Sequence, residues 1–480
     1  MFSALSHWFQ RQVRSGRASR QRRRSRSAFR PRLEALEERW VPATLKVSSS
    51  ADDVTMIGTL RWAVANAHDG DVIEILPYPW TGQARHITLT HGELFLNHHV
   101  TIESVGPEAT IDGNFSSRAF EVARGATVEF DNLLISDGNA KANNRLGNAS
   151  LDGDGGGILN EGSLTMNHCG VHDCIFGGGI YNYHGYLFVY NESFVNHNFA
   201  GIGGGIYNDH GTLLMLDTAL VANGAGDLGG AIFNAGGQDG NAGGYAEIDH
   251  CALVFNHALR GGAIANFGGD VELNSTGLYQ NTASLVGGAL FNTGGVLGVN
   301  AGCTLKDNHT VKGGGGIYNN FGALYVTSSS LFHNTTEGDG GGIDSVGGSV
   351  SILDCHLEKN SAGGVGGGIF DLSSTVTVSD SLLELNSALA GGGIYNDEGK
   401  MTVTDSKLIF NFVSFFSGGI ANFEGTMQVT GSQFIQNSAP AGAAIFNSLG
   451  TVMVGTTLFQ QNGPDTIDGP YIDQGGNNFI

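Results

Sequence analysis

The chain has 480 residues, of which 76 are Gly, 8 are Pro and 14% are charged. Glycine without a three-residue period excludes collagen, and the hydrophobic content of 41% is enough for a continuous core. A membrane-spanning helix needs about 20 consecutive apolar residues. The sequence has no run approaching that length and predicts no transmembrane segment.

Charge divides the chain into a basic start and an acidic remainder. Residues 1–39 hold eleven Arg and three Glu, a net charge of +8, so the remainder of this −21 chain carries −29. An acidic surface repels phosphates, and we therefore expect no nucleic-acid partner. Divalent cations and basic partners suit it better.

We interpret residues 1–43 as a disordered basic export or sorting segment. Its arginines resemble the start of an export signal, although no long apolar stretch follows. RPRLEALEERWVPAT (30–44), followed by GTLRWAVANAHDGDVIEI (58–75), resembles the N-termini of exported planctomycete proteins. That resemblance implies sorting through Leu33, Leu36, Glu37 and Arg39, and an extracellular or cell-surface location associated with the outer membrane.

Residues 44–150 are predicted to form an N-terminal cap and irregular first coils. Within them, residues 59–68 have the pattern of a short helix: Thr59 suits the N-cap, Leu60, Val64 and Ala67 share one face, and Gly70 follows as a stop. A helix here would cover the open end of a strand stack.

Residues 151–462 contain a repeat of about 26 residues. Each copy has small residues followed by an aliphatic residue, and these aliphatic residues are Ile158, Ile180, Ile206, Ile232, Ile264, Leu290, Ile317, Ile343, Ile369, Ile394, Ile420 and Ile445. A fixed period of this length indicates one supersecondary unit stacked on copies of itself.

Each repeat holds a second phrase, an apolar residue with Asn three positions later, as in Leu331 and Asn334. Three short runs of strand period separated by Gly, Asn and Ser turns predict an all-β, right-handed parallel β-helix of about sixteen coils, about 4.8 Å apart. Glycines before each Ile allow a tight bend. We expect the second-phrase Asn at a left-handed corner, with its amide bonded to the next coil. The repeat is absent from residues 463–480, which are expected to form a C-terminal cap.

The GGAI and F-x-x-N phrases resemble the repeats of chlamydial-type polymorphic outer membrane proteins over residues 155–462. Those proteins are surface adhesins and autotransporters, so the resemblance implies adhesion. The chain ends at Ile480 without the alternating segments of a membrane barrel, and self-translocation is not expected.

Four of the five cysteines share one position of the repeat. Cys251, Cys303 and Cys355 alternate with Thr or Ser, which puts them about two coils apart, beyond disulfide reach. We interpret this column as small and buried, without a metal or redox role. Cys169 and Cys174 lie in one coil, and a disulfide between them stays open as an alternative.

Asp354, Asp380 and Asp405 each stand six residues before the corner Asn of three successive coils. Stacking makes them an acidic column and the candidate ligands of a Ca²⁺ ion. The alternative is that each caps a turn, because Asp217 and Ser328 hold the same position elsewhere. Asp152 and Asp154 in LDGDGGG are a second cation candidate. No other cofactor is expected.

Catalysis has little support in the sequence. Basic residues are few between 151 and 462: Arg260, Lys306, Lys312, Lys359, Lys400 and Lys407. His184 and His210 share a column, but the paired aspartates of polygalacturonases are missing. We name no catalytic residue and expect a structural or adhesive surface protein that binds a glycan or protein ligand. The alternative is a carbohydrate-active β-helix enzyme, either a polysaccharide lyase or a glycoside hydrolase.

Overall fold

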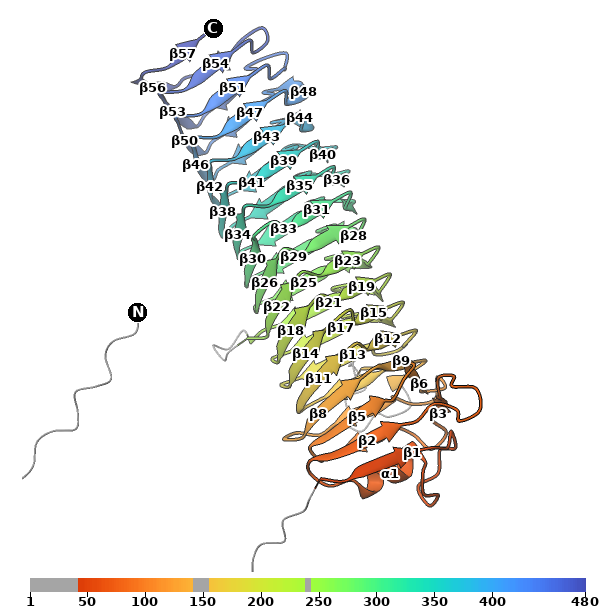
Figure 1. Cartoon of the computed structure of the whole chain (residues 1–480). Helices are drawn as coiled ribbons and strands as arrows, with labels where there is room; N and C mark the ends of the chain where they lie inside the picture. The colour runs from red at the N-terminus through yellow and green to blue at the C-terminus, as the bar shows by residue number, and fades with distance from the viewer. Residues whose placement is uncertain (1–41, 141–154, 238–242) are drawn as a thin grey trace, which may run out of the picture. The chain divides into compact units, whose positions relative to one another are not determined.

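The computed structural model describes residues 42–140, 155–237 and 243–480. The basic segment up to residue 41 and the candidates Asp152 and Asp154 lie outside the described residues. Parallel strands are stacked in successive coils, as Figure 1 shows. In these described ranges, the three main sheets have 17, 15 and 16 strands, which corresponds to about sixteen coils. The predicted all-β, right-handed parallel β-helix is confirmed.

One coil illustrates the whole stack. It begins with β37 (Ile343–Val346) in the 15-stranded sheet C and continues with β38 (Ser349–Leu353) in the 17-stranded sheet A. β39 (His356–Glu358) follows in the 16-stranded sheet B, and β40 (Ser361–Ala362) completes the coil. Apolar residues alternate inward along these strands and make one continuous core.

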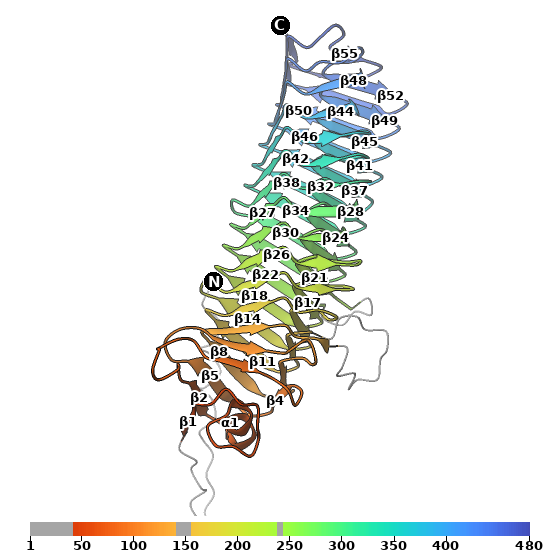
Figure 2. The same ribbon diagram turned by 90° about the vertical axis from the view of Figure 1, so that its right-hand side faces the viewer.

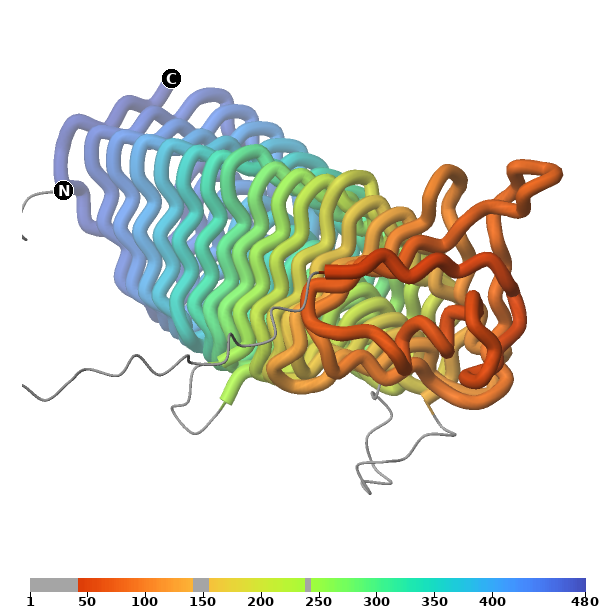
Figure 3. Tube along the Cα trace, turned by 60° about the horizontal axis from the view of Figure 1, so that its bottom comes forward, coloured from red at the N-terminus to blue at the C-terminus, as the bar shows by residue number. Residues whose placement is uncertain are grey.

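Equivalent residues of neighbouring coils stack in register. Ile343 pairs with Ile317 on one side and with Ile369 on the other, and all three side chains are fully buried. The same bends recur from coil to coil in Figure 3. The predicted aliphatic column is therefore confirmed.

A fourth sheet was missed by the sequence reading, which expected three strands in each coil. Over the described residues, sheet D has nine short strands, from β16 (Phe199–Ala200) to β48 (Phe412–Phe416). Several of its strands have only two residues, which is too few to show an alternating pattern in the sequence. Outside the main core, aromatic side chains of sheet C such as Tyr207 and Phe291 form a second buried cluster, with Val286 of β28 (Thr282–Val286) packed against it.

The bends use left-handed residues, but one of them was assigned to the wrong position. Gly340, three residues before Ile343, has φ +66°, and a Cβ there would lie 2.5 Å from the Ile343 carbonyl oxygen, as the glycine prediction requires. At the second bend, the left-handed residue is Lys359 (φ 54°) rather than Asn360. The reason is burial: Asn360 directs its amide into the dry interior, and the exposed residue before it makes the turn.

At the N-terminal end of the stack, α1 (Leu60–Asn66) packs beside β1 (Thr44–Val47) and β2 (Asp71–Ile75), as Figure 2 shows. The Thr59 hydroxyl accepts a hydrogen bond from the Trp62 backbone N–H at 3.2 Å, in agreement with the predicted N-cap. At the other end, residues 463–480 add one further strand to each main sheet: β55 (Ile467–Asp468), β56 (Ile472–Gly475) and β57 (Asn478–Phe479). Among the described residues, no helix is long and apolar enough to cross a membrane.

Candidate functional site

An open groove of about 430 Å³ crosses neighbouring coils at the turns between sheet A and sheet B. It contains all three predicted aspartates together with hydroxyl and basic side chains. Its polar and charged lining includes Ser328, Asp354, His356, Asp380, Asp405 and Lys407. The groove extends along the stack rather than into it, because each coil contributes the same short turn.

The three aspartates share a backbone conformation, and each is exposed. Asp354, Asp380 and Asp405 have φ values of 54°, 50° and 49°. This left-handed conformation is one that Asp tolerates better than most residues. The Asp354 N–H donates to the Ser379 carbonyl at 3.2 Å, which fixes the two turns one coil apart. The structure thus brings the three predicted residues together, and each one also occupies a turn.

The column has different neighbours at its two ends. In the preceding coil, the Ser328 hydroxyl donates to Asp354 Oδ2 at 3.0 Å. In the coil after Asp405, Gly431 takes the same turn with φ +64°, and a Cβ there would lie 2.2 Å from Asp405 Oδ1. The acidic column therefore spans three coils and is bounded by a hydroxyl and by a glycine.

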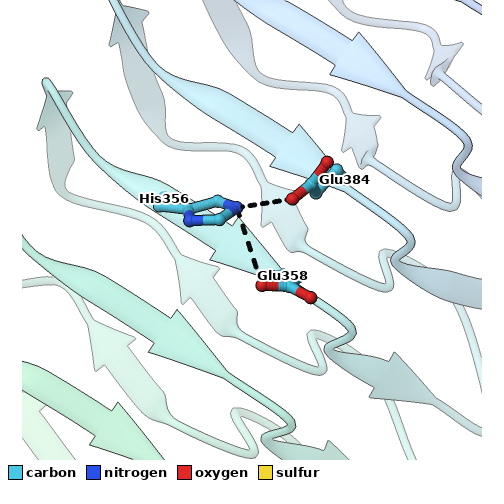
Figure 4. Close-up of side chains that lie close together, drawn as sticks. All are labelled: His356, Glu358 and Glu384. Atoms are coloured by element: carbon cyan, nitrogen blue, oxygen red, sulfur yellow. Dashed lines mark hydrogen bonds and ion pairs between the residues drawn. The ribbon is translucent and has the colours of Figure 1, made fainter.

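A mixed cluster of one imidazole and two carboxylates shares His356 with this groove. Figure 4 shows its three side chains. His356 and Glu358 are the first and last residues of β39, and Glu384 ends β43 (Leu382–Glu384) in the next coil. The His356 Nε2 atom lies 3.0 Å from Glu384 Oε1 and 3.8 Å from Glu358 Oε2. All three side chains are half-buried, and one ligand atom from each lies within 4.8 Å of the other two.

Two lysines that looked scattered in the sequence belong to this region. Lys407 lines the groove, and Lys359 bonds to Glu358 Oε1. The Lys359 hydrogen bond is the main reason that the pKa of Glu358 lies below its ordinary value. The sequence reading missed His356, Glu358 and Glu384, although the coil period places Glu358 directly beside Glu384 and strand alternation places His356 on the same face.

The remaining sequence candidates lie apart from this site. The rings of His184 and His210 stack with centroids 5.2 Å apart, as their shared column predicts, and His210 Nδ1 lies 2.5 Å from Asp209 Oδ1. Arg260 pairs with Asp227 at 2.7 Å. Neither pair borders the groove.

The cysteines are free and buried, as the column of small residues predicted. Cys169 and Cys174 do not form the disulfide that was left open. Burial raises the pKa of Cys251 to about 12, so its thiol stays protonated at neutral pH.

No protein-family profile matches the chain, and no curated protein matches it. One similar solved structure is tailspike protein 3 of bacteriophage CBA120, with 12% sequence identity and a TM-score of 0.25. That match covers 92% of this chain and 61% of the tailspike chain. A TM-score this low carries no argument about function.

Proposed function

We propose that this chain is an exported, cell-surface or secreted β-helix protein with a structural and adhesive role, and that the groove at Asp354, Asp380 and Asp405 contacts its ligand. The open groove across neighbouring coils is the observation that carries the proposal. A groove along the stack fits an extended chain. Its carboxylates can accept hydrogen bonds from sugar hydroxyls or peptide N–H groups, and its hydroxyls can both donate and accept them. The ligand would be a surface glycan or an extended protein segment.

Location and adhesion are supported by the two sequence resemblances. Residues 30–44 resemble the sorting region of exported proteins, and the repeats resemble those of surface adhesins. The acidic column adds a Ca²⁺ proposal, because stacked carboxylates supply the oxygen ligands that this ion prefers. A bound Ca²⁺ would reduce repulsion among the three aspartates and contribute oxygen-binding positions to the ligand surface.

A carbohydrate-active enzyme is the second candidate, and the same groove favours it. Carboxylates of neighbouring coils lie about 4.8 Å apart along the backbone, and retaining glycosidases hold theirs at about 5–5.5 Å. His356 and Lys407 offer proton-transfer groups on the same groove. Against this reading, the three aspartates are exposed turn residues, whereas general-acid carboxyls are usually set against apolar side chains.

The test is a binding screen of the full chain on a glycan array and a panel of extended peptides, with and without Ca²⁺, with mass spectrometry of the ligands afterwards. We expect a bound ligand of unchanged mass. The double variant Asp380→Asn/Asp405→Asn should weaken this binding at least 10-fold. Asp217→Asn, at the same turn position of a distant coil, serves as the matched control and should leave binding unchanged.

Three results would contradict the proposal. Cleavage of a polysaccharide would establish the enzyme instead. Equal binding by the groove variant and the wild type would place the ligand elsewhere. No binding in the whole screen would remove the adhesive role.

A further inference from the structure

The cluster of His356, Glu358 and Glu384 presents a problem of charge. Glu358 and Glu384 are directly opposite each other in neighbouring parallel strands. Like charges in this arrangement repel and destabilise a sheet. Burial adds to the cost, because only 19% of the Glu358 side chain and 26% of the Glu384 side chain are exposed. A positive charge between the two carboxylates would offset this repulsion.

The orientation of the side chains leaves a defined place for that charge. Lys359 bonds to Glu358 Oε1, so the other oxygen, Oε2, is the one that faces His356. The His356 ring packs edge-on against Phe332 with centroids 5.1 Å apart, which orients Nε2 toward both carboxylates. Three ligand atoms from two neighbouring coils thus converge on one point.

Within the part of the chain that the structure describes, this is the one group of three His, Cys, Asp or Glu side chains close enough to share a metal ion. In the flanking coils, Phe332 and Ile409 replace Glu358 and Glu384, and Ser330 and Leu382 replace His356. The cluster is therefore not a general property of the repeat. Its apolar neighbours limit access of water to the two carboxylates, which strengthens their attraction for a cation.

We propose that His356, Glu358 and Glu384 bind a divalent transition-metal ion of the Zn²⁺ type, with Nε2, Oε2 and Oε1 as ligand atoms. Zn²⁺ takes imidazole nitrogen and carboxylate oxygen at about 2.0–2.2 Å, which puts tetrahedral ligands about 3.3 Å apart. The distances from Nε2 to the two carboxylates, 3.0 and 3.8 Å, lie on either side of that value. Small side-chain rotations would complete the site.

The choice of metal follows from the donors. Ca²⁺ and Mg²⁺ prefer sites built from oxygen alone, whereas an imidazole favours Zn²⁺ and its neighbours among the transition metals. Three protein ligands leave a fourth position open to water or to an outside oxygen donor. Because the ligands come from two coils, the ion would link β39 to β43. This inference does not depend on the proposed ligand groove.

Calorimetric titration of the metal-free full chain with Zn²⁺ at pH 7.5 tests the proposal. We expect one saturable site whose Kd rises roughly 100-fold in His356→Gln and in Glu384→Gln, since each variant removes one of three ligands. His333→Gln is the matched control, because His333 lies in the preceding coil beside Asp307. Circular dichroism checks that every variant keeps the β-helix.

A second readout identifies the ligands directly. Co²⁺ in the same site should give the intense visible absorption of four-coordinate geometry, and His356→Gln should abolish it. Zn²⁺ binding that persists in His356→Gln, or no saturable binding by the wild type, would overturn the proposal. In either case the cluster would be an ion pair only.

Discussion

Two buried ladders of polar side chains extend along the coils, and they differ in continuity. The corner ladder consists of the second-phrase asparagines from Asn198 to Asn462. The side-chain amide of each Asn in this ladder donates to the side-chain oxygen of the Asn in the next coil, at 2.9–3.1 Å and without interruption. Each amide also donates to a carbonyl of the preceding coil, as Asn360 does to Leu331 at 2.9 Å.

The sheet ladder consists of the first-phrase residues from Asn160 to Asn447. Its amide–amide links are 2.7–2.9 Å as far as Asn319 and are interrupted between Asn319 and Asn396. They resume from Asn396 through Asn422 to Asn447, at 2.6 and 2.8 Å. Asn319 is 3.4 Å from the Ser345 hydroxyl, and the next member is Asp371. Among the described residues, Asp371 Oδ2 and Asn396 Oδ1 are buried without a hydrogen-bond partner.

The difference between the two ladders shows why Asn suits this position. Asn both donates and accepts, so each copy satisfies the next, whereas an ionised Asp only accepts. Both oxygens lie close to the position that a Cβ on Gly399 would occupy, at 2.0 Å for Asp371 Oδ2 and 2.4 Å for Asn396 Oδ1. The two acceptor oxygens are therefore close to each other. A proton on Asp371 would restore the missing donor.

The largest effect should come from interrupting the continuous ladder. Asn308→Ala removes an amide that bonds Leu278, Asn281 and Asn334, and it leaves their buried groups unsatisfied. We expect the free energy of unfolding to fall by about 3–5 kcal/mol in urea denaturation. Asn274→Ala, on the outward face of β26 (Asp270–Asn274), is the control and should change it by less than about 1 kcal/mol. Equal losses would mean that the corner ladder does not stabilise the stack.

The second test concerns the proton at Asp371. Burial is the main cause that raises the pKa of Asp371 to about 6 from its ordinary 3.8. A raised pKa in the folded state favours the neutral acid, so its stabilising contribution is complete below about pH 4 and is lost as pH rises through 6. The wild type should lose about 2–3 kcal/mol relative to Asp371→Asn between pH 4 and pH 7.

Urea denaturation of both proteins across that range provides the measurement. The comparison at each pH cancels other buried acids, including Asp344, whose pKa is also raised by burial. Parallel pH profiles for wild type and variant would contradict a protonated link to Asn396.

A smaller gain is expected from repairing the other weak link. Ser345→Asn supplies an amide next to Asn319 and should lengthen the intact part of the sheet ladder by one member. It also displaces the Ser345 bond to Ser374, which offsets part of the gain. We expect about 1 kcal/mol of stabilisation by thermal or urea unfolding. A loss of similar size would show that the serine pair, rather than an amide, suits this coil.

The smallest effect on stability should come from the exposed acidic column. Asp380→Asn keeps a residue that tolerates the left-handed turn and removes one charge from three stacked carboxylates. We expect a change within about 0.5 kcal/mol in the same urea assay. A loss above 2 kcal/mol would mean that the aspartate holds the turn, and the proposed ligand role would lose its basis.

The sequence predicted the coil period, the aliphatic column and the amide bonding, because each depends on one residue type recurring at one spacing. Ile317, Ile343 and Ile369 therefore stack as predicted. The left-handed position was wrong by one residue. Asn favours that conformation more than Lys does, but Asn360 is buried and the exposed Lys359 makes the turn instead. His356, Glu358 and Glu384 were missed, since their significance appears only when residues of two coils are placed side by side.

The most direct test of the account is a cross-link between neighbouring turns of the groove, because every proposed site depends on coils stacked in this register. Neighbouring parallel strands place equivalent Cα atoms about 4.8 Å apart, within disulfide range, and alternate coils place them about 9–10 Å apart, beyond it. Asp354→Cys/Asp380→Cys should therefore form an intramolecular disulfide under mild oxidation, whereas Asp354→Cys/Asp405→Cys should not. A disulfide in the second variant and none in the first would contradict the register, and the groove and metal site with it.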